Sequence, residues 1–188
     1  MGKLILIIGG ARSGKSRFAM ELARKSGKSV LFVATATAGD EEMAQRIARH
    51  RQERPAHWRT IEVTTDIGKR IKKEIGEAKL VIVDCITLLV NNIFSEGGYQ
   101  VTAPEEARLE KRIASEINSL IDCLKGAEAT FIVITNEIGL GLVPADKMSR
   151  LYRDLLGKVN QMLAQSADEV YLMVAGLPVK ISPSTPEL

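Results

Sequence analysis

A glycine-rich segment near the amino end constrains this chain more than any other feature. It runs Gly9-Gly10-Ala11-Arg12-Ser13-Gly14-Lys15-Ser16, the pattern G-x-x-x-x-G-K-S, between an apolar run at 4–8 and an amphipathic helical pattern. A strand that ends in such a loop and continues as a helix directs backbone N–H groups and the positive end of the helix dipole at one point. The segment therefore predicts a phosphate-binding loop for a nucleoside triphosphate. An ordinary glycine turn would not explain the whole pattern at this junction.

Two side chains of this loop are candidates for direct roles. Lys15 is placed to reach the β- and γ-phosphates of a bound triphosphate, which makes it a candidate catalytic residue. The hydroxyl of Ser16 is placed to bind Mg²⁺. The loop thus predicts that the chain handles a triphosphate, but it leaves the reaction open.

The rest of the chain alternates between short apolar runs and amphipathic helical patterns. The runs are rich in Val and Ile without polar alternation, which is typical of strands buried on both faces. Such strands separated by helices predict an α/β fold of the P-loop NTPase type, with a mostly parallel sheet and helices on both faces. We expect strands at 3–8, 29–34, 60–63, 79–83, 130–135 and 169–174, and helices at 15–26, 40–52, 66–75, 86–94, 104–125 and 146–166. One nucleotide-binding catalytic domain would span 1–181, with a loop at Gly97-Gly98 and a flexible tail at 182–188.

Composition and charge argue against several classes of protein. The 188 residues carry a net charge of only +3, so no overall positive field favours nucleic acid as a partner. The apolar runs have the length of strands, which predicts no membrane span, and the first of them begins too early for a signal peptide. Cys85 and Cys123 form no C-x-x-C pair, which favours a reducing compartment. We therefore expect a cytoplasmic protein.

Residues that follow the strands are candidates for the site, because ligands of such sheets bind beyond the carboxyl ends of the strands. Asp84 ends an apolar strand, where an acidic side chain holds Mg²⁺ in proteins with this loop, although it could instead cap the next helix. The strand at 130–135 is followed by Asn136-Glu137-Ile138-Gly139-Leu140-Gly141. That segment fits either a backbone shaped around a ligand or a plain loop.

The helix expected at 40–52 carries a histidine among arginines. Met43, Ile47 and His50 share one stripe of this helix, so a packed histidine is one interpretation of His50. Arginines lie within four residues of it, at Arg46, Arg49, Arg51 and Arg54. Guanidinium groups make bidentate contacts with phosphates, although these side chains could also simply face solvent. Clustered positive charge disfavours a protonated imidazole and leaves a ring nitrogen able to attack phosphorus.

Two residues beyond this helix are candidates for contacts with a base. Glu62 lies on the next short strand, and its carboxylate could accept hydrogen bonds from guanine N1–H and N2–H, a donor pair that adenine lacks. Glu62 could equally be an exposed strand residue. Trp58 offers an aromatic face for stacking, although packing is the commoner role of such a residue.

The motifs occur in an order that resembles one enzyme family. The phosphate loop is followed by A-T-A-T, R-I-A-R-H-R-Q-E-R-P-A-H-W-R-T-I-E, V-D-C-I-T-L, N-E-I-G-L-G-L-V-P and Y-R-D-L-L-G-K-V-N-Q. The loop alone is unspecific, but R-P-A-H-W and N-E-I-G-L-G-L-V-P together are highly specific. Over residues 3–181 the chain resembles the bifunctional adenosylcobinamide kinase/adenosylcobinamide-phosphate guanylyltransferase.

The resemblance implies two reactions in cobalamin (vitamin B12) biosynthesis. GTP or ATP would phosphorylate the aminopropanol hydroxyl of adenosylcobinamide, and GTP would then give GMP to that phosphate, forming adenosylcobinamide-GDP. The resemblance also implies a covalent GMP intermediate on His50 and a homotrimer with active sites near the subunit contacts. The implied nucleotide contacts are Gly9, Gly10, Ala11, Arg12, Ser13, Gly14, Lys15, Ser16, Ala34, Thr35, Ala36, Arg51, Gln52, Glu53, Arg54, Glu62 and Asp84, and the metal ligands Ser16 and Asp84.

Two other hypotheses fit the same residues. A small-molecule kinase with this loop would phosphorylate its acceptor without transferring a nucleotide, and a nucleotide-dependent switch would bind with negligible chemistry. The sequence does not choose between ATP and GTP as phosphoryl donor. Candidate corrinoid contacts are 99–110 and Tyr152-Arg153.

Overall fold

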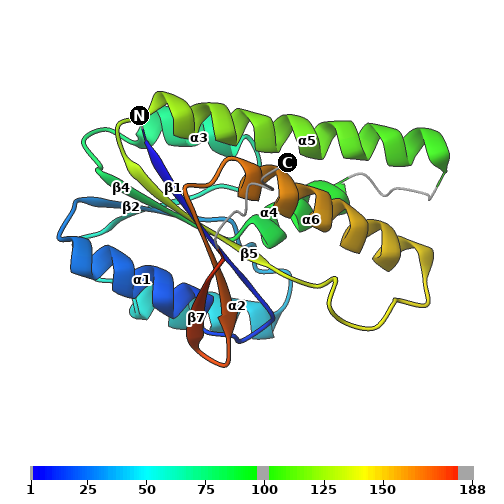
Figure 1. Cartoon of the computed structure of the whole chain (residues 1–188), viewed down its shortest axis with the longest axis horizontal. Coiled ribbons are helices and arrows are strands. Elements are labelled where there is room, and N and C mark those ends of the chain that lie inside the picture. The colour runs from blue at the N-terminus through cyan, green and yellow to red at the C-terminus, as the bar shows by residue number, and fades with distance from the viewer. Residues whose placement is uncertain (1, 97–101, 182–188) are drawn as a thin grey trace, which may run out of the picture.

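The computed structural model describes residues 2–96 and 102–181, which form a sheet with helices on both faces (Figure 1). The expected loop at Gly97-Gly98 and the expected tail at 182–188 lie outside the described residues. Within them the sheet has seven strands in the order β3-β2-β4-β5-β1-β6-β7. The strands are β1 (Lys3–Gly9), β2 (Val30–Ala34), β3 (Arg59–Glu62), β4 (Leu80–Asp84), β5 (Thr130–Asn136), β6 (Glu169–Val174) and β7 (Leu177–Ile181). All are parallel except β7, which runs antiparallel to β6.

The direction of the chain through the sheet places the helices. From β1 the chain moves to β2 and then to the edge strand β3, and it returns in the other direction through β4, β5 and β6. Because crossovers between parallel strands are right-handed, helices on the outward path and on the return path cover opposite faces. Figure 1 shows α1 (Lys15–Ser26) and α2 (Glu41–Gln52) on one face. It shows on the other face α3 (Ile67–Glu74), α4 (Ile86–Glu96), α5 (Ala103–Gly126) and α6 (Lys147–Gln165).

This arrangement confirms the predicted α/β fold with a mostly parallel sheet between two helical layers. Among the residues that the structure describes, no helix is both long enough and apolar enough to cross a bilayer.

Each face of the sheet packs a core of its own. Leu6, Val33 and Val83 belong to a large cluster with α3, α4, α5 and α6. Phe32 and Ile82 belong to a smaller cluster with α1 and Trp58. Successive side chains of a strand point to opposite faces, so strands buried on both sides have to be apolar throughout. None of the described side chains of α2 belongs to either cluster.

The strand β7 is the one element that the sequence analysis missed. It pairs with β6 through the two-residue turn Ala175-Gly176, whose φ angles are 51° and 84°. A two-residue hairpin turn of type I′ needs positive φ at both positions. Asn-Gly or Asp-Gly usually signals such a turn in a sequence, whereas Ala-Gly does not. Pro178 also argued against a strand, because proline is tolerated mainly on edge strands, where β7 lies.

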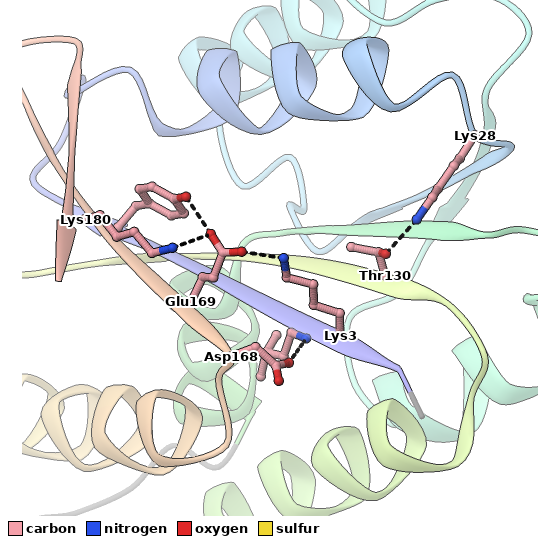
Figure 2. A network of polar contacts seen from close by, with 8 residues as sticks. Lys3, Lys28, Thr130, Asp168, Glu169 and Lys180 are labelled. Carbon is pink, nitrogen blue, oxygen red and sulfur yellow. Dashed lines mark hydrogen bonds and ion pairs between the residues drawn. The ribbon is translucent and has the colours of Figure 1, made fainter. Parts of the chain in front are cut away.

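Polar contacts fasten β6 to its neighbours at the amino end of the sheet. Figure 2 shows Glu169 between Lys3 and Lys180, with which it forms ion pairs. The hydroxyl of Tyr171 donates a hydrogen bond of 2.5 Å to the same carboxylate. The hydrogen bond from Lys3 is the main cause that lowers the pKa of Glu169 to about 2, and the bond from Tyr171 comes next. This network lies at the opposite end of the strands from the phosphate loop.

Candidate active site

The register of the sheet gathers most of the predicted site residues at one edge. Glu62 on β3 lies beside Ala34 on β2, and Ala34 lies beside Asp84 on β4. On the other side of β4, the end of β5 lies beside β1, with Asn136 opposite Gly9 at the start of the phosphate loop. Neighbouring strands are about 4.8 Å apart, so the row from β3 to β1 covers roughly 19 Å. The candidate site therefore extends along one edge of the sheet.

The phosphate loop holds its lysine inside the turn. The Nζ of Lys15 donates hydrogen bonds to the carbonyl oxygens of Gly9, at 3.0 Å, and Gly10, at 2.6 Å, and the residue is only 8% exposed. Gly14 precedes α1 with φ at 95°, a left-handed conformation that favours glycine. No side chain caps the amino end of α1 and its first turn contains no acidic residue. This helix end is therefore suited to an anion.

The turn between β6 and β7 braces this loop from behind. The backbone N–H of Gly176 donates to the carbonyl of Ser13 at 3.0 Å. A Cβ atom on Gly9 would lie 2.7 Å from the carbonyl oxygen of Met173, so only glycine fits there. The Oγ of Ser13 is buried and has no hydrogen-bond partner in the described protein. A buried hydroxyl of this kind normally has a partner, and a bound phosphate would supply one.

Asp84 lies at the end of β4 within electrostatic reach of the phosphate loop. Burial and, next, the charge of Asp84 raise the pKa of the adjacent Cys85 to about 12, and the charge of Lys15 opposes both. Lys15 therefore lies close to the Asp84–Cys85 segment. A carboxylate and the hydroxyl of Ser16 are oxygen donors of the kind that Mg²⁺ prefers. Among the described residues, no three or more His, Cys, Asp or Glu side chains come together as a metal-binding group.

The helix α2 is held much more loosely than α1. Its amino end is capped by Asp40, whose carboxylate accepts a hydrogen bond of 2.7 Å from the backbone N–H of Met43. Every one of its described side chains is exposed or only half-buried, and His50 in the last turn is half-buried. The interpretation of His50 as a histidine packed in the core is therefore wrong. The side chain of Arg46 lies outside the described part of the structure.

A pocket of about 450 Å³ lies between α2 and the ends of β2 and β3. Its lining includes Ala36, Ile47, Ala48, Arg51, Glu62 and Thr64. Arg51 and Glu62 form an ion pair on its wall, with both side chains more than half exposed. His50 does not line this pocket, but it lies between two helix positions that do, Ile47 and Arg51. An apolar floor with one carboxylate and one guanidinium is suited to a polar aromatic ligand.

The segment after α2 is tied to the smaller core. The guanidinium of Arg54 lies 3.8 Å from the centre of the Phe32 ring, and Trp58 is buried in the same cluster. Burial lowers the pKa of Arg54, and the negative charge of Asp84 opposes that shift. Arg24 on α1 donates a hydrogen bond of 2.8 Å to the carbonyl of Glu53. Trp58 is therefore a packing residue, whereas Arg54 lies near the carboxyl edge of the sheet.

Some predicted contacts lie in other surroundings. Thr35 is fully buried, and its hydroxyl donates to the carbonyl of Cys85 at 2.7 Å and accepts from the Cys85 N–H at 2.8 Å. This side chain connects the ends of β2 and β4, so its hydroxyl has a structural role. Gln52, the last residue of α2, and Glu53, which follows it, are both exposed.

Comparison with known proteins shows the family. The model of the family described as cobinamide kinase / cobinamide phosphate guanyltransferase matches residues 5–181. The chain is 43% identical over 182 residues to the bifunctional adenosylcobalamin biosynthesis protein CobU of Escherichia coli, which covers 95% of this chain and 99% of that protein. It is 41% identical to CobP of Pseudomonas aeruginosa over 94% of this chain and 95% of that protein. This chain belongs to the cobinamide kinase / cobinamide phosphate guanyltransferase family. It is therefore a transferase, and the resemblance found in the sequence is confirmed.

A kinase has to hold an acceptor as well as a nucleotide. The sequence did not reveal the polar residues that fix the end of β5, beside the phosphate loop. Thr87, at the start of α4, accepts a hydrogen bond of 2.7 Å from the backbone N–H of Asn136. Asn160 on α6 is buried, accepts from Thr135 at 2.8 Å and donates to the Asn136 carbonyl at 3.0 Å. A polar residue inside a helical pattern gives no signal of such a role. The threonine in V-D-C-I-T-L, three residues after Asp84, was the only available hint.

Proposed function

We propose that this chain phosphorylates adenosylcobinamide with GTP or ATP and then transfers GMP from GTP to the product through a covalent intermediate on His50. The observation that best supports this is the neighbourhood of α2. The last turn of that helix places His50 between residues lining a pocket that contains Glu62. The pocket opens at the same edge of the sheet as the phosphate loop and Asp84. This arrangement supports the proposed roles of His50 as nucleophile, of the pocket as base site and of the phosphate loop as triphosphate anchor.

The kinase step uses the phosphate loop. The backbone amides at the start of α1 and the ammonium of Lys15 would hold the β- and γ-phosphates and offset the charge that develops during transfer. Ser16 and Asp84 would hold Mg²⁺, which when bound supplies further charge neutralisation on the phosphates. The hydroxyl oxygen of the acceptor would bond to the γ-phosphorus as the bond to the β-phosphate oxygen breaks. The nucleoside diphosphate would leave with that electron pair, and the hydroxyl proton would pass to water.

The transfer step needs attack at the α-phosphorus instead. A neutral ring nitrogen of His50 would form a bond to the α-phosphorus while the bond to the bridging oxygen of the β-phosphate breaks, and pyrophosphate would leave with that electron pair. A phosphate oxygen of phosphorylated adenosylcobinamide would then attack the same phosphorus and break the phosphorus–nitrogen bond. Adenosylcobinamide-GDP would form and His50 would be regenerated. Two displacements replace one difficult reaction between two anions.

The pocket beside α2 would select guanine. The carboxylate of Glu62 can accept from N1–H and N2–H of guanine, and adenine cannot donate this pair. Its ion pair with Arg51 is exposed to solvent, and such pairs contribute about 0–1 kcal/mol. A guanine base could therefore replace Arg51 at little cost. Substitution Glu62→Gln should reduce labelling by GTP, and His57→Gln, on an exposed residue that does not line this pocket, is the matched control.

We also propose that the chain works as a homotrimer. The edge strand β7 supports a contact between copies, because it exposes Leu177 (69%), Val179 (50%) and Ile181 (43%) on an unpaired edge. Exposed apolar edge strands of this kind favour association. The native mass, measured by light scattering, tests the stoichiometry, and a monomeric mass at working concentration would contradict it.

The experiment that tests the proposed function is labelling with GTP that carries a radioactive α-phosphate. The unmodified chain and the control Gln45→Ala, a substitution of an exposed α2 residue, should both acquire acid-labile label. His50→Ala should acquire none, because the phosphorus–nitrogen bond has no nitrogen to form with. A chain that phosphorylates adenosylcobinamide without ever acquiring label would be a kinase alone. Label that persists in His50→Ala would remove His50 from the mechanism.

A further inference from the structure

The end of β5 is fixed by hydrogen bonds from two helices of the larger layer. Thr87 and Asn160 hold the backbone of Asn136, as described above. The hydroxyl of Tyr152 on α6 donates in turn to the carbonyl of Thr87 at 2.9 Å. The Tyr152 ring also packs edge-on against Phe94 of α4, with the ring centres 5.4 Å apart. Side chains of α4, α6 and β5 thus form one connected unit at the carboxyl edge of the sheet.

The chain that leaves this unit starts directly beside the phosphate loop. The backbone N–H of Glu137 donates to the carbonyl oxygen of Gly9 at 3.0 Å. The loop from Ile138 to Pro144 then runs outward and is tied back to α6. Arg150 donates to the carbonyl oxygens of Pro144, at 2.9 Å, and Ala145, at 2.6 Å. A molecule bound at this loop therefore has a short path to a phosphoryl group on the phosphate loop.

Between this loop, α4 and α6 lies a pocket of about 310 Å³. Its walls are mainly apolar and aromatic, from Phe94, Ile138, Pro144, Met148 and Tyr152. Its polar groups are the side chains of Asn91, Ser149 and Arg153. Apolar walls with a few polar groups are typical of small-molecule sites. No residue of the proposed nucleotide site lines this pocket.

The apolar surface continues outside the pocket along the same loop. Leu140 is 83% exposed, Leu142 is 96% exposed and Val143 is 69% exposed. Apolar side chains exposed together on one short loop mark a contact surface. The same loop thus provides both lining residues of the pocket, Ile138 and Pro144, and exposed apolar side chains.

We propose that this pocket, together with the loop Ile138–Pro144, is the subsite that holds the corrinoid acceptor. The assignment rests on the proposed function, because the acceptor is the cobinamide of the family description. A corrinoid combines a large apolar macrocycle with peripheral carboxamides and an aminopropanol arm. The pocket is too small for the whole macrocycle, so it takes one edge, while Leu140, Leu142 and Val143 contact the face that remains outside. Asn91, Ser149 and Arg153 bond the carboxamides, and the arm extends along Glu137 toward the phosphate loop.

The location of the pocket favours this occupant over a second nucleotide. The phosphate loop and the pocket beside α2 already provide groups for a triphosphate and for guanine, whereas this pocket offers Arg153 as its only cation among the lining residues, and that guanidinium contacts Asp154 at 3.2 Å. The pocket is also lined from α4 and α6, whereas the pocket with Glu62 is lined from α2, a helix that covers the other face of the sheet (Figure 1). Acceptor and nucleotide would therefore approach the phosphate loop from different directions, as transfer between them requires.

The test is equilibrium dialysis of cobinamide, with a non-hydrolysable GTP analogue and Mg²⁺ present, against the unmodified chain and two variants. Ser149→Phe places a ring at the mouth of the pocket from an exposed position. Gln161→Phe, an exposed residue of the same helix that does not line the pocket, is the matched control. We expect the Kd for cobinamide to rise at least about tenfold in Ser149→Phe, because the pocket is blocked, and to stay within about twofold in Gln161→Phe. Melting temperatures of both variants check that they fold.

The outcomes separate the subsite from the proposed function. Equal Kd values for Ser149→Phe and the unmodified chain would overturn the subsite even if GTP labels His50. A raised Kd for Ser149→Phe in a chain that GTP never labels would support the subsite and contradict the transfer step. Leu142→Ser gives a second test, with a weaker but measurable loss of cobinamide affinity expected. A change in native mass with unchanged cobinamide affinity in Leu142→Ser would instead assign the exposed loop to a contact between copies of the chain and overturn this part of the proposal.

Discussion

The two helices that share one face of the sheet are built in opposite ways. The helix α1, which follows the phosphate loop, buries Lys15, Ala19, Met20 and Ala23 against the sheet. The helix α2, which carries His50, buries none of its described side chains. The phosphate loop therefore leads into a helix that packs in the core, whereas the proposed nucleophile lies on a helix with no described side chain in it. We therefore expect substitutions on α2 to change the reaction with little loss of stability, and substitutions in the phosphate loop to lower both.

The sequences of the two helices explain the difference. Small residues at 19 and 23 let α1 lie close to the strands, and its ends are shaped by Gly14 and Gly27, both with positive φ. α2 consists mainly of charged and small residues, and Asp40 supplies its only side-chain cap. Its stabilisation therefore comes from local helix contacts and from the segment around Arg54, which packs on Phe32. A helix of this kind is held in place by few apolar contacts.

The largest effect is expected from removing the nucleophile. His50→Asn should reduce formation of adenosylcobinamide-GDP at least about a thousandfold, because the covalent route is lost. The melting temperature should stay within about 2 °C, since the side chain is only half-buried. Turnover assays and thermal melts measure the two quantities. A variant that unfolds would break the comparison, because α2 would then be part of the core.

A somewhat smaller effect is expected at the phosphate loop. Lys15→Met should slow phosphorylation of adenosylcobinamide about 10²–10³-fold, because a charge that stabilises the transferring phosphoryl group is removed. It should also lower the melting temperature, because Lys15 bonds two carbonyl oxygens of the loop. Lys25→Met, on an exposed lysine of the same helix, is the control. If Lys15→Met melts like the control, the anchor is not part of the core.

Two substitutions of apolar residues compare how much the core and α2 contribute to stability. Ile7→Ala removes a fully buried side chain of β1 from the same core cluster as α1 and should lower the free energy of unfolding by about 2–5 kcal/mol. Ile47→Ala removes a half-buried side chain of α2 and should lower it by less than about 1 kcal/mol. Urea titrations of both variants measure the difference. Equal losses would contradict the loose attachment of α2.

The smallest effect is expected at the amino end of the sheet, which is the opposite end of the strands from the phosphate loop. The hydrogen bond from Lys3 depresses the pKa of Glu169 to about 2, so its contribution to stability is complete above the ordinary pKa of a glutamate and is lost as the pH falls toward 2. The chain should therefore be more stable than Glu169→Gln at pH 7, and the gap should close between about pH 4.5 and pH 2. Urea midpoints across that range measure it. A difference in stability that grows as the pH falls would contradict this prediction.

Much of the fold could be predicted because buried parallel strands have to be apolar throughout. Runs such as Leu80–Asp84 therefore identify themselves, and each strand brings the residue after it to one edge. Asp84 became a candidate in that way, and the phosphate loop was predicted from its own glycine-rich pattern. The hairpin turn Ala175-Gly176 was missed, because its positive φ values come from tertiary contacts, including the bond from Gly176 to the phosphate loop, and not from a recognisable turn sequence.

The sequence supplied candidate residues for the site, but it could not predict their surroundings. The row from Glu62 to Asp84 depends on strand order, which the sequence does not state. Thr35 looked like a nucleotide contact, but its hydroxyl joins two strands through Cys85. The stripe with His50 suggested a face packed on the core, yet α2 lies at the surface because the sheet beneath is already covered by α1 and the segment around Trp58. Whether an apolar stripe of a helix is buried depends on the whole fold.

The central claim is that α2 presents a nucleophile to a triphosphate that the phosphate loop anchors. Mass spectrometry of the intact chain after incubation with GTP and Mg²⁺ alone, followed by peptide mapping, tests it most directly. The account predicts an increase in mass equal to one GMP group, located on His50 and lost in acid. An unchanged mass, or an adduct on any other side chain, would contradict it.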